Sequence, residues 1–161
     1  MQPLIGLLTD YGLSDPYVGL LHAAVHRIVP RARVVDLTHA IGPQQIAHGA
    51  FVLRTVWSDW PAEGVLCAVV DPGVGTSRPL VAAKWAGRAV VVAPDNGLLG
   101  GLRLEAGPPQ QVVELDKPIY WGPSRSATFH GRDMLAPVAA HVAAGCSLAE
   151  VGTERVPGDV M

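Results

Sequence analysis

The 161-residue sequence is poor in charge and in cysteine, and both shortages exclude classes of protein. Charged residues make up 16% of the chain and the formal net charge is -2. That composition gives no sign of the basic patch that marks nucleic-acid-binding or membrane-surface proteins. The two cysteines, Cys67 and Cys146, form no Cys-x-x-Cys pair. We expect buried free thiols in a cytoplasmic protein, without a disulfide or a metal site.

Long apolar segments are also lacking. The N-terminal stretch has no charged leader and its apolar run is too short for a signal peptide. No run reaches the length of a transmembrane helix, so no membrane partner is expected. Hydrophobic residues nevertheless make up 49% of the chain, which at this length predicts one globular domain with its own core.

Short apolar runs alternate with helical patterns along the chain. The apolar runs predict strands at residues 4–8, 33–37, 65–70, 80–85, 89–93 and 111–115. The helical patterns run from near Asp15 to Val29, from near Pro43 through Trp57, and from Gly131 to Ala144. This alternation predicts an α/β fold in which a mostly parallel sheet is sandwiched between helices in three layers. Residues 1–153 would form this domain and residues 154–161 a linker.

Aspartate ends four of the expected strands, at Asp10, Asp36, Asp71 and Asp95. Ligands of open α/β sheets bind beyond the carboxyl ends of the strands. Four carboxylates at one edge would form a negative pocket, which suits a cation, a metal ion or the paired hydroxyls of a sugar. Each aspartate also fits a plain turn, since Asp71-Pro72-Gly73 and Asp95-Asn96-Gly97 are good turn sequences. Both interpretations stay open at this point.

Histidines and glycines give weaker signals. Gly73-Val74-Gly75 follows a strand but lacks the other residues of a dinucleotide or phosphate loop. His22 and His26 lie opposite an apolar helical stripe, which indicates a solvated face rather than a metal site. His130 precedes an expected helix, where a side chain can face a pocket. It also fits a helix-start residue that takes no part in chemistry.

A set of motifs resembles one known family, the SAM hydroxide adenosyltransferases. These adenosine-forming S-adenosylmethionine (SAM) hydrolases are relatives of fluorinase and chlorinase. The matching stretches cover nearly the whole chain in order: 9–12 (TDYG), 15–19 (DPYVG), 36–39 (DLTH), 70–75 (VDPGVG) with Arg78, 93–98 (APDNGL) and 128–133 (TFHGRD). The water-using branch carries an Asp, Arg and His cluster, which falls here on Asp71, Arg78 and His130. Fluorinase lacks that cluster and has serine at the position of Gly131, so halide binding is not expected.

The resemblance implies a reaction and roles for individual residues. Water would displace methionine from C5′ of the ribose and give adenosine and L-methionine, with SAM as the substrate and no cofactor or metal. Arg78 and His130 would position the water, while Asp71 would orient both and balance the charge of Arg78.

Binding roles are implied for a second set of residues. Asp10 would accept both ribose hydroxyls. Asp15 would contact the methionine amino group, although it equally fits the N-cap of the first helix. The other substrate-binding candidates are Tyr11, Asn96 and Gly131.

The resemblance also implies parts that this chain does not contain. Family members carry a β-rich C-terminal domain that supplies most of the adenine pocket, and they complete the site between subunits of a homotrimer. They usually place an aromatic residue where this chain has Gln44. We therefore expect residues 1–161 alone to hydrolyse SAM poorly or not at all. Two alternatives remain: a non-catalytic SAM- or adenosine-binding oligomerisation domain, and a metal-dependent hydrolase that binds Mg²⁺ through the strand-end aspartates.

Overall fold

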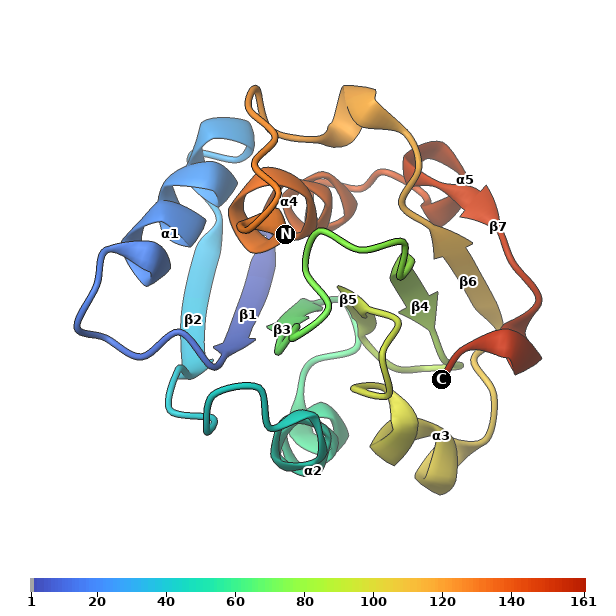
Figure 1. Cartoon of the computed structure of the whole chain (residues 1–161). Helices are drawn as coiled ribbons and strands as arrows, with labels where there is room; N and C mark the ends of the chain where they lie inside the picture. Colours follow the sequence, from blue (N-terminus) through green and yellow to red (C-terminus); the bar gives the residue numbers. More distant parts are fainter. Residues whose placement is uncertain (1) are drawn as a thin grey trace.

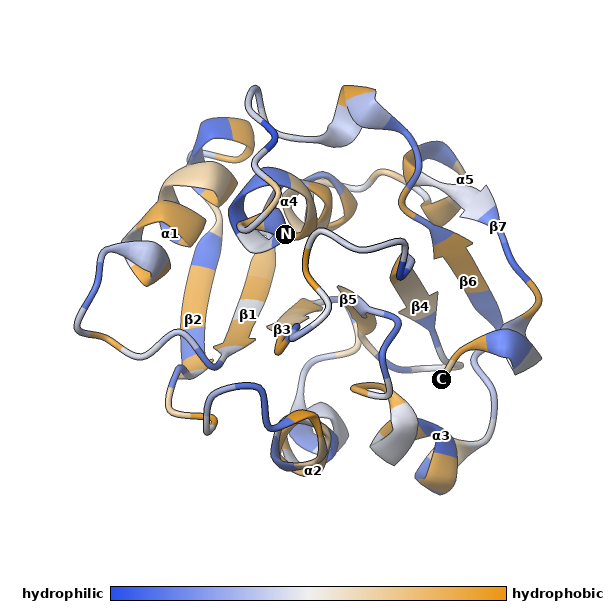
Figure 2. Cartoon of the chain, in the orientation of Figure 1, coloured by the Kyte–Doolittle hydropathy of each residue, from blue (hydrophilic) through white to orange (hydrophobic). Residues whose placement is uncertain are grey.

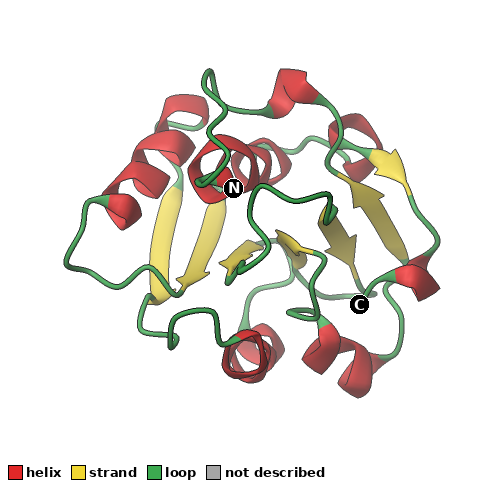
Figure 3. Cartoon of the chain, viewed as in Figure 1, coloured by secondary structure: helices red, strands yellow, loops and turns green. Residues whose placement is uncertain are grey.

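A seven-stranded sheet forms the centre of the computed structural model, which describes residues 2–161 (Figures 1 and 3). Its strand order is β2-β1-β3-β5-β4-β6-β7. β1, β2, β3 and β5 pair in parallel, whereas β4 is antiparallel to β5 and β6, and β7 is antiparallel to β6. The strands are β1 (Leu4–Thr9), β2 (Arg33–Thr38), β3 (Val65–Val69), β4 (Leu80–Lys84), β5 (Val90–Pro94), β6 (Gln111–Glu114) and β7 (Thr153–Glu154).

Helices cover both faces of the sheet (Figure 1). α1 (Tyr17–Ile28) and α4 (Ala136–Ala143) lie on one face, together with the short α5 (Leu148–Val151). α2 (Ile46–Asp59) and α3 (Gly100–Ala106) lie on the other face. The expected three-layer α/β fold is confirmed. Within residues 2–161, no helix combines the length and the apolarity needed to cross a bilayer.

Alternate residues of the central strands feed two separate cores. Leu7 and Cys67 pack towards α1 and α4, whereas Leu8 and Leu66 pack towards α2 and α3. Because both faces of these strands are buried, their sequences are continuously apolar (Figure 2). Both cysteines are free thiols, as expected, although Cys146 is only half-buried. Burial raises the pKa of the Cys67 thiol to about 12.

The helices differ in detail from those expected. α1 begins at Tyr17 with Pro16 at its N-cap, so Asp15 does not cap it. The third expected helix is two elements, a π-helical turn at Gly131–Leu135 followed by α4. A reason for the π-helical turn is Pro137, which has no N–H to donate to the Asp133 carbonyl; that carbonyl instead accepts a hydrogen bond from Gly122 N at 2.7 Å. α3, α5 and β7 are all short, and none of them was predicted from the sequence.

Residues 154–161 pack against the domain rather than forming the expected linker. Glu154 belongs to β7, and Val160 is completely buried. Arg155 Nη1 donates to Asp95 Oδ2 at 3.1 Å, and Met161 N donates to Asp95 Oδ1 at 2.8 Å. The buried Asp95 carboxylate therefore anchors this segment. The domain boundary after residue 153 stays a prediction.

Replacing Arg155 by alanine should destabilise the domain by about 2 kcal/mol, because the buried Asp95 carboxylate loses its cationic partner. Urea denaturation of the two proteins measures the difference. Arg103→Ala is the control, since Arg103 makes one exposed bond to the Gly158 carbonyl and its loss should cost about 0.5 kcal/mol or less. Equal stability of Arg155→Ala and wild type would mean that this segment is not part of the folded unit.

Candidate active site

Asp71, Arg78 and His130 come together at the carboxyl edge of the sheet. Asp71 lies shortly after β3, Arg78 shortly before β4, and His130 directly before the π-helical turn. Arg78 Nε donates to Asp71 Oδ1 at 2.8 Å and to Oδ2 at 2.9 Å, and Nη2 also donates to Oδ2. The same Nη2 lies 2.9 Å from His130 Nδ1. The side chains of Arg78 and Asp71 are only 10% and 5% exposed, so this ion pair is largely shielded from water.

The contact with Arg78 determines the protonation state of His130. A guanidinium group can only donate hydrogen bonds, so His130 Nδ1 must be the acceptor. Burial and the positive charge of Arg78 lower the pKa of His130, which favours the neutral ring. In that tautomer Nε2 carries the hydrogen. His130 therefore presents an N–H donor, and not a basic nitrogen, on its free side.

A compact turn places Asp71 and Arg78 on the same side. Val74 N donates to the Asp71 carbonyl at 3.2 Å, and Thr76 Oγ1 donates to the Gly73 carbonyl at 2.6 Å. Gly75 has a φ of +81°, and a Cβ there would lie 2.5 Å from the Ala127 carbonyl oxygen. The Gly-Val-Gly sequence thus serves the turn and the close approach of residue 127, in agreement with the absence of a phosphate-loop motif.

Tyr11 lies beside this cluster and in contact with Gly131. A Cβ built on Gly131 would collide with the Tyr11 hydroxyl oxygen, so that position has no room for a side chain. Burial raises the pKa of Tyr11 well above its ordinary value, and the nearby Cys67, Asp10 and Asp71 raise it further. Tyr11 therefore remains a neutral phenol that can donate or accept a hydrogen bond.

The aromatic rings of Tyr11, Tyr17 and Phe129 line a cavity of about 440 Å³. The Phe129 ring meets Tyr11 and Tyr17 edge-on, with centroids 5.6 and 5.3 Å apart. The Arg132 guanidinium lies 4.8 Å from the centre of the Phe129 ring, and Asp133 pairs with Arg132 at 2.7 Å. The walls of this cavity are thus electron-rich rings and a cation that is already neutralised.

The other predicted binding residues have different environments. Asp10 Oδ2 accepts a hydrogen bond from Gln44 N at 2.8 Å. Asp15 is exposed and holds no helix cap. Asn96 Nδ2 donates to the Val70 carbonyl and Asn96 Oδ1 accepts from Leu98 N, so its side chain ties the end of β3 to the turn after β5. The substrate-binding roles of these residues stay predictions.

The four strand-end aspartates do not share one pocket. Each carboxylate has its own partners: Gln44 N for Asp10, His22 and His39 for Asp36, Arg78 for Asp71, and Arg155 with Met161 N for Asp95. Asp36 was expected to end its strand but lies inside β2, which continues to Thr38. Across residues 2–161, no group of three or more His, Cys, Asp or Glu side chains is placed to hold a metal ion.

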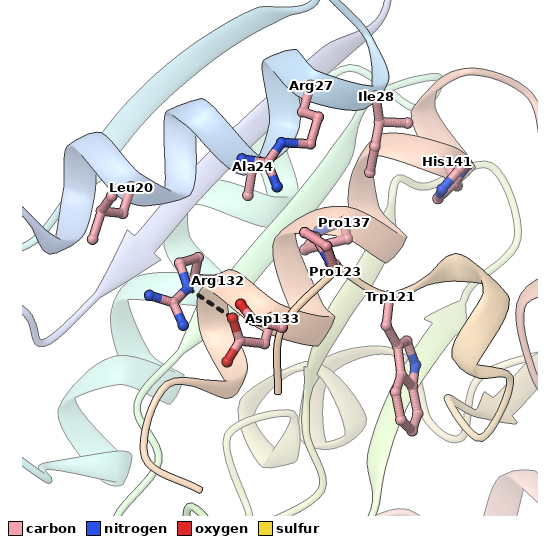
Figure 4. A pocket seen from close by; sticks show the side chains of 12 residues that line it. Leu20, Ala24, Arg27, Ile28, Trp121, Pro123, Arg132, Asp133, Pro137 and His141 are labelled. Carbon is pink, nitrogen blue, oxygen red and sulfur yellow. Dashed lines mark hydrogen bonds and ion pairs between the residues drawn. The ribbon is translucent and has the colours of Figure 1, made fainter. Parts of the chain in front are cut away.

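A second cavity of about 260 Å³ lies between α1, α4 and residues 121–124 (Figure 4). Figure 4 shows the Arg132–Asp133 ion pair at its border, with Arg27 and His141 further along the two helices. Asp133 Oδ2 also accepts from Ser126 N at 2.7 Å, which holds the loop before Phe129. None of Asp71, Arg78 and His130 lines this cavity.

The residues that surround the cluster are harder to read from the sequence. The contact between Tyr17 and Phe129 joins segments that are far apart along the chain, and periodicity gives no hint of it. His39 belongs to the motif at residues 36–39, yet no role was predicted for it from the sequence. His39 directly follows the edge strand β2, whose residues are exposed or half-buried, so no sequence pattern marked the burial of its ring.

Comparison with known proteins shows which family the chain belongs to. The family model for the SAM hydroxide adenosyltransferase N-terminal domain matches residues 5–152. A protein of Salinispora arenicola named (R)-S-adenosyl-L-methionine hydrolase is 46% identical over 97% of this chain and 59% of its own length. A fluorinase of Nocardia brasiliensis is 25% identical over 99% of this chain and 60% of its own length.

A solved structure also resembles the fold. The crystal structure of an uncharacterized conserved protein from Thermotoga maritima superposes with a TM-score of 0.91 at 40% identity, over 98% of this chain and 60% of that one. With this fold and this cluster, the chain belongs to the SAM hydroxide adenosyltransferase family and corresponds to its N-terminal domain. It spans about 60% of the length of the named hydrolase and fluorinase relatives.

Substituting alanine for Gly131 should destabilise the protein by about 1–3 kcal/mol, because the new methyl group collides with the Tyr11 hydroxyl. Urea denaturation measures the effect. In the Tyr11→Phe background the same substitution should cost clearly less, since the colliding oxygen is gone. Gly19→Ala is the matched control: Gly19 lies in α1 with open space around it, and alanine there should be neutral or slightly stabilising. Equal costs in both backgrounds would contradict the close contact.

Proposed function

We propose that this chain is the catalytic α/β domain of an enzyme that hydrolyses SAM to adenosine and L-methionine. The observation that carries the proposal is the shielded Asp71–Arg78–His130 cluster at the carboxyl edge of the sheet. Relatives named (R)-S-adenosyl-L-methionine hydrolase, 42–46% identical to this chain, support the same activity.

The difficult part of this reaction is the use of water as the nucleophile, and the cluster is suited to that part. The leaving group is a sulfonium that departs as a neutral thioether, so it needs no general acid. Water is a weak nucleophile, and its oxygen becomes more positive as it bonds C5′, so it must be oriented and must lose a proton. The Nε2–H of His130 and an N–H of Arg78 are donors that can orient the water. The attack forms the O–C5′ bond and breaks the C5′–S bond in one in-line step.

The proton of the attacking water has one acceptor within the cluster. His130 Nδ1 is occupied by Arg78, and His130 Nε2 already carries hydrogen. Arg78 directs two hydrogens at Asp71, because Nε carries a single hydrogen that the two carboxylate oxygens share, so lone pairs remain on the carboxylate. We assign the proton to one of these lone pairs on Asp71, from which it passes to solvent. The overall reaction converts SAM and water into adenosine, methionine and one proton.

The aromatic cavity fits the charge of this substrate. SAM carries a sulfonium cation, and the electron-rich faces of aromatic rings attract such cations. Tyr11, Tyr17 and Phe129 line the cavity next to Gly131, which adjoins His130. Asp10 lies at the end of β1 on the same edge, where one carboxylate can accept both ribose hydroxyls.

The rest of the enzyme lies outside this chain. Relatives are longer, and the resemblance places most of the adenine pocket in their C-terminal domain. We propose that the complete enzyme is a cytoplasmic homotrimer that needs no cofactor, as the sequence and the family resemblance indicate. The low content of cysteine supports a cytoplasmic location. The sites that family members complete between neighbouring subunits support the trimer.

One observation favours the alternative of a binding domain without turnover. Gln44 stands where the family usually has an aromatic residue, and its backbone is left-handed with a φ of +63°. Its backbone N–H donates to Asp10 Oδ2, so this segment lies against the proposed ribose-binding residue without offering a ring. This chain could then hold SAM or adenosine loosely. No comparable observation supports a metal-dependent hydrolase, and a chelator should leave SAM hydrolysis unchanged.

Asp71→Asn tests the proposed function. The amide keeps the size of the carboxylate but loses its charge, so Arg78 loses its counter-ion and the water its proton acceptor. We expect the release of adenosine and methionine from SAM to fall about 100-fold or more. Chromatography of SAM incubated with each protein measures both products.

The same assay has a matched control and a clear contrary result. Asp59→Asn removes an exposed carboxylate at the end of α2, and it should leave the rate unchanged. Equal product from wild type and Asp71→Asn would refute the assigned role of Asp71. SAM binding by calorimetry without any product in wild type would instead favour the binding-domain alternative.

The pH profile tests the neutral state of His130. Because its pKa is lowered from the ordinary value of about 6.5, the neutral donor persists below that pH. Hydrolysis should therefore stay constant as pH falls past about 6.5 and decline only as pH passes through the lowered pKa. His130→Gln offers an amide donor that does not titrate, so its residual activity should lack this decline. A decline centred above pH 6.5 in wild type would contradict the neutral assignment.

A further inference from the structure

The loop between β1 and α1 is fastened by side chains that the proposed chemistry does not use. This loop carries Asp10 and Tyr11. Thr9 ends β1 and is completely buried. Its Oγ1 accepts a hydrogen bond from Tyr11 N at 3.1 Å and shares one with His39 Nδ1 at 2.8 Å.

His39 holds the same loop at a second point. It lies directly after β2, the neighbour of β1 in the sheet, and is 5% exposed. Its carbonyl accepts a hydrogen bond from Gly12 N at 2.8 Å. The side chain and the main chain of one residue thus fasten the loop on both sides of Asp10 and Tyr11.

Asp36 determines which residue donates the hydrogen bond between Thr9 and His39. His39 Nε2 lies 3.0 Å from Asp36 Oδ1. Although burial alone would raise it, hydrogen bonds with His39 and His22 hold the pKa of the Asp36 carboxyl below its ordinary value, so it is ionised. The carboxylate therefore favours hydrogen on Nε2 of His39, which leaves Nδ1 as an acceptor for the Thr9 hydroxyl. The Thr9 oxygen is then free to accept from Tyr11 N.

We infer that Thr9 and His39 are positioning residues that hold Asp10 and Tyr11 in place for the substrate. The inference rests on the proposed function, which assigns these two residues to SAM. It predicts an effect on affinity rather than on turnover. Asp71, Arg78 and His130 lie on other loops, and neither Thr9 nor His39 bonds to them.

Thr9→Val tests the fastening directly. Valine has nearly the shape of threonine but no hydroxyl, so Tyr11 N and His39 Nδ1 both lose their partner. Amide hydrogen exchange at Tyr11 and Gly12 should become about tenfold faster, whereas amides of β3 should keep their wild-type rates. Thr9→Ser retains the hydroxyl and should restore slow exchange at both amides.

Thr55→Val is the matched control. It removes the same atoms, but the Thr55 hydroxyl donates to the Phe51 carbonyl within α2 and has no contact with the loop. Exchange at Tyr11 and Gly12 and the affinity for SAM should equal those of wild type. Unchanged exchange at Tyr11 and Gly12 in Thr9→Val would overturn the inference.

SAM binding and hydrolysis separate a positioning role from a merely structural one. In Thr9→Val the dissociation constant and the KM for SAM should rise about tenfold with little change in kcat, and Thr9→Ser should restore them. Faster exchange with wild-type affinity would show that the fastening serves the fold alone, against the inference. If wild type does not bind SAM, the proposed function fails and substrate positioning with it. The exchange rates would still show whether Thr9 holds the loop.

Discussion

The buried ion pair between Arg78 and Asp71 is the interaction on which the rest of the site depends. A shielded guanidinium is tolerated only when its charge is balanced and its N–H groups are bonded. Asp71 supplies the balance, and the remaining hydrogen of Nη2 goes to His130. One cation therefore joins the loop after β3 to the segment before the π-helical turn, and it determines which nitrogen of His130 carries hydrogen. The parallel strands matter because they deliver both loops to one edge.

The sequence predicted those parts that follow from local pattern. Strands buried on both faces are continuously apolar, and strands such as β3 were therefore readable. That Asp71, Arg78 and His130 belong to one cluster was predicted from motifs that resemble a known family, and not from the periodicity of apolar residues. The packing of residues 154–161 depends on Asp95, a contact between distant segments that no local pattern could reveal. Pro137 was a local sign of the irregular turn before α4, because it cannot donate to the Asp133 carbonyl.

Asp95 and Asp36 show why strand-end carboxylates were ambiguous. All four aspartates lie towards one edge, as the parallel topology requires, but a buried carboxylate takes whichever donors the surrounding fold offers. Asp95 bonds a cation and a backbone N–H near the chain end, whereas Asp36 pairs with two histidines. Only Asp71 is paired with a cation that also bonds a histidine. The choice between structural and chemical aspartates therefore depends on their partners, which the sequence does not display.

The charge of the cluster also bears on the choice of nucleophile. Asp71 cancels the charge of Arg78, and burial keeps His130 neutral, so the group has no net charge. A bare anion gains little from such a site, because leaving water costs it far more than a neutral molecule pays. A neutral molecule such as water loses less on entering, which agrees with the proposed reaction. Gly131 is a separate constraint beside the cluster, because a side chain at that position would displace Tyr11. The balance of charge, in contrast, follows from the contacts of one buried arginine.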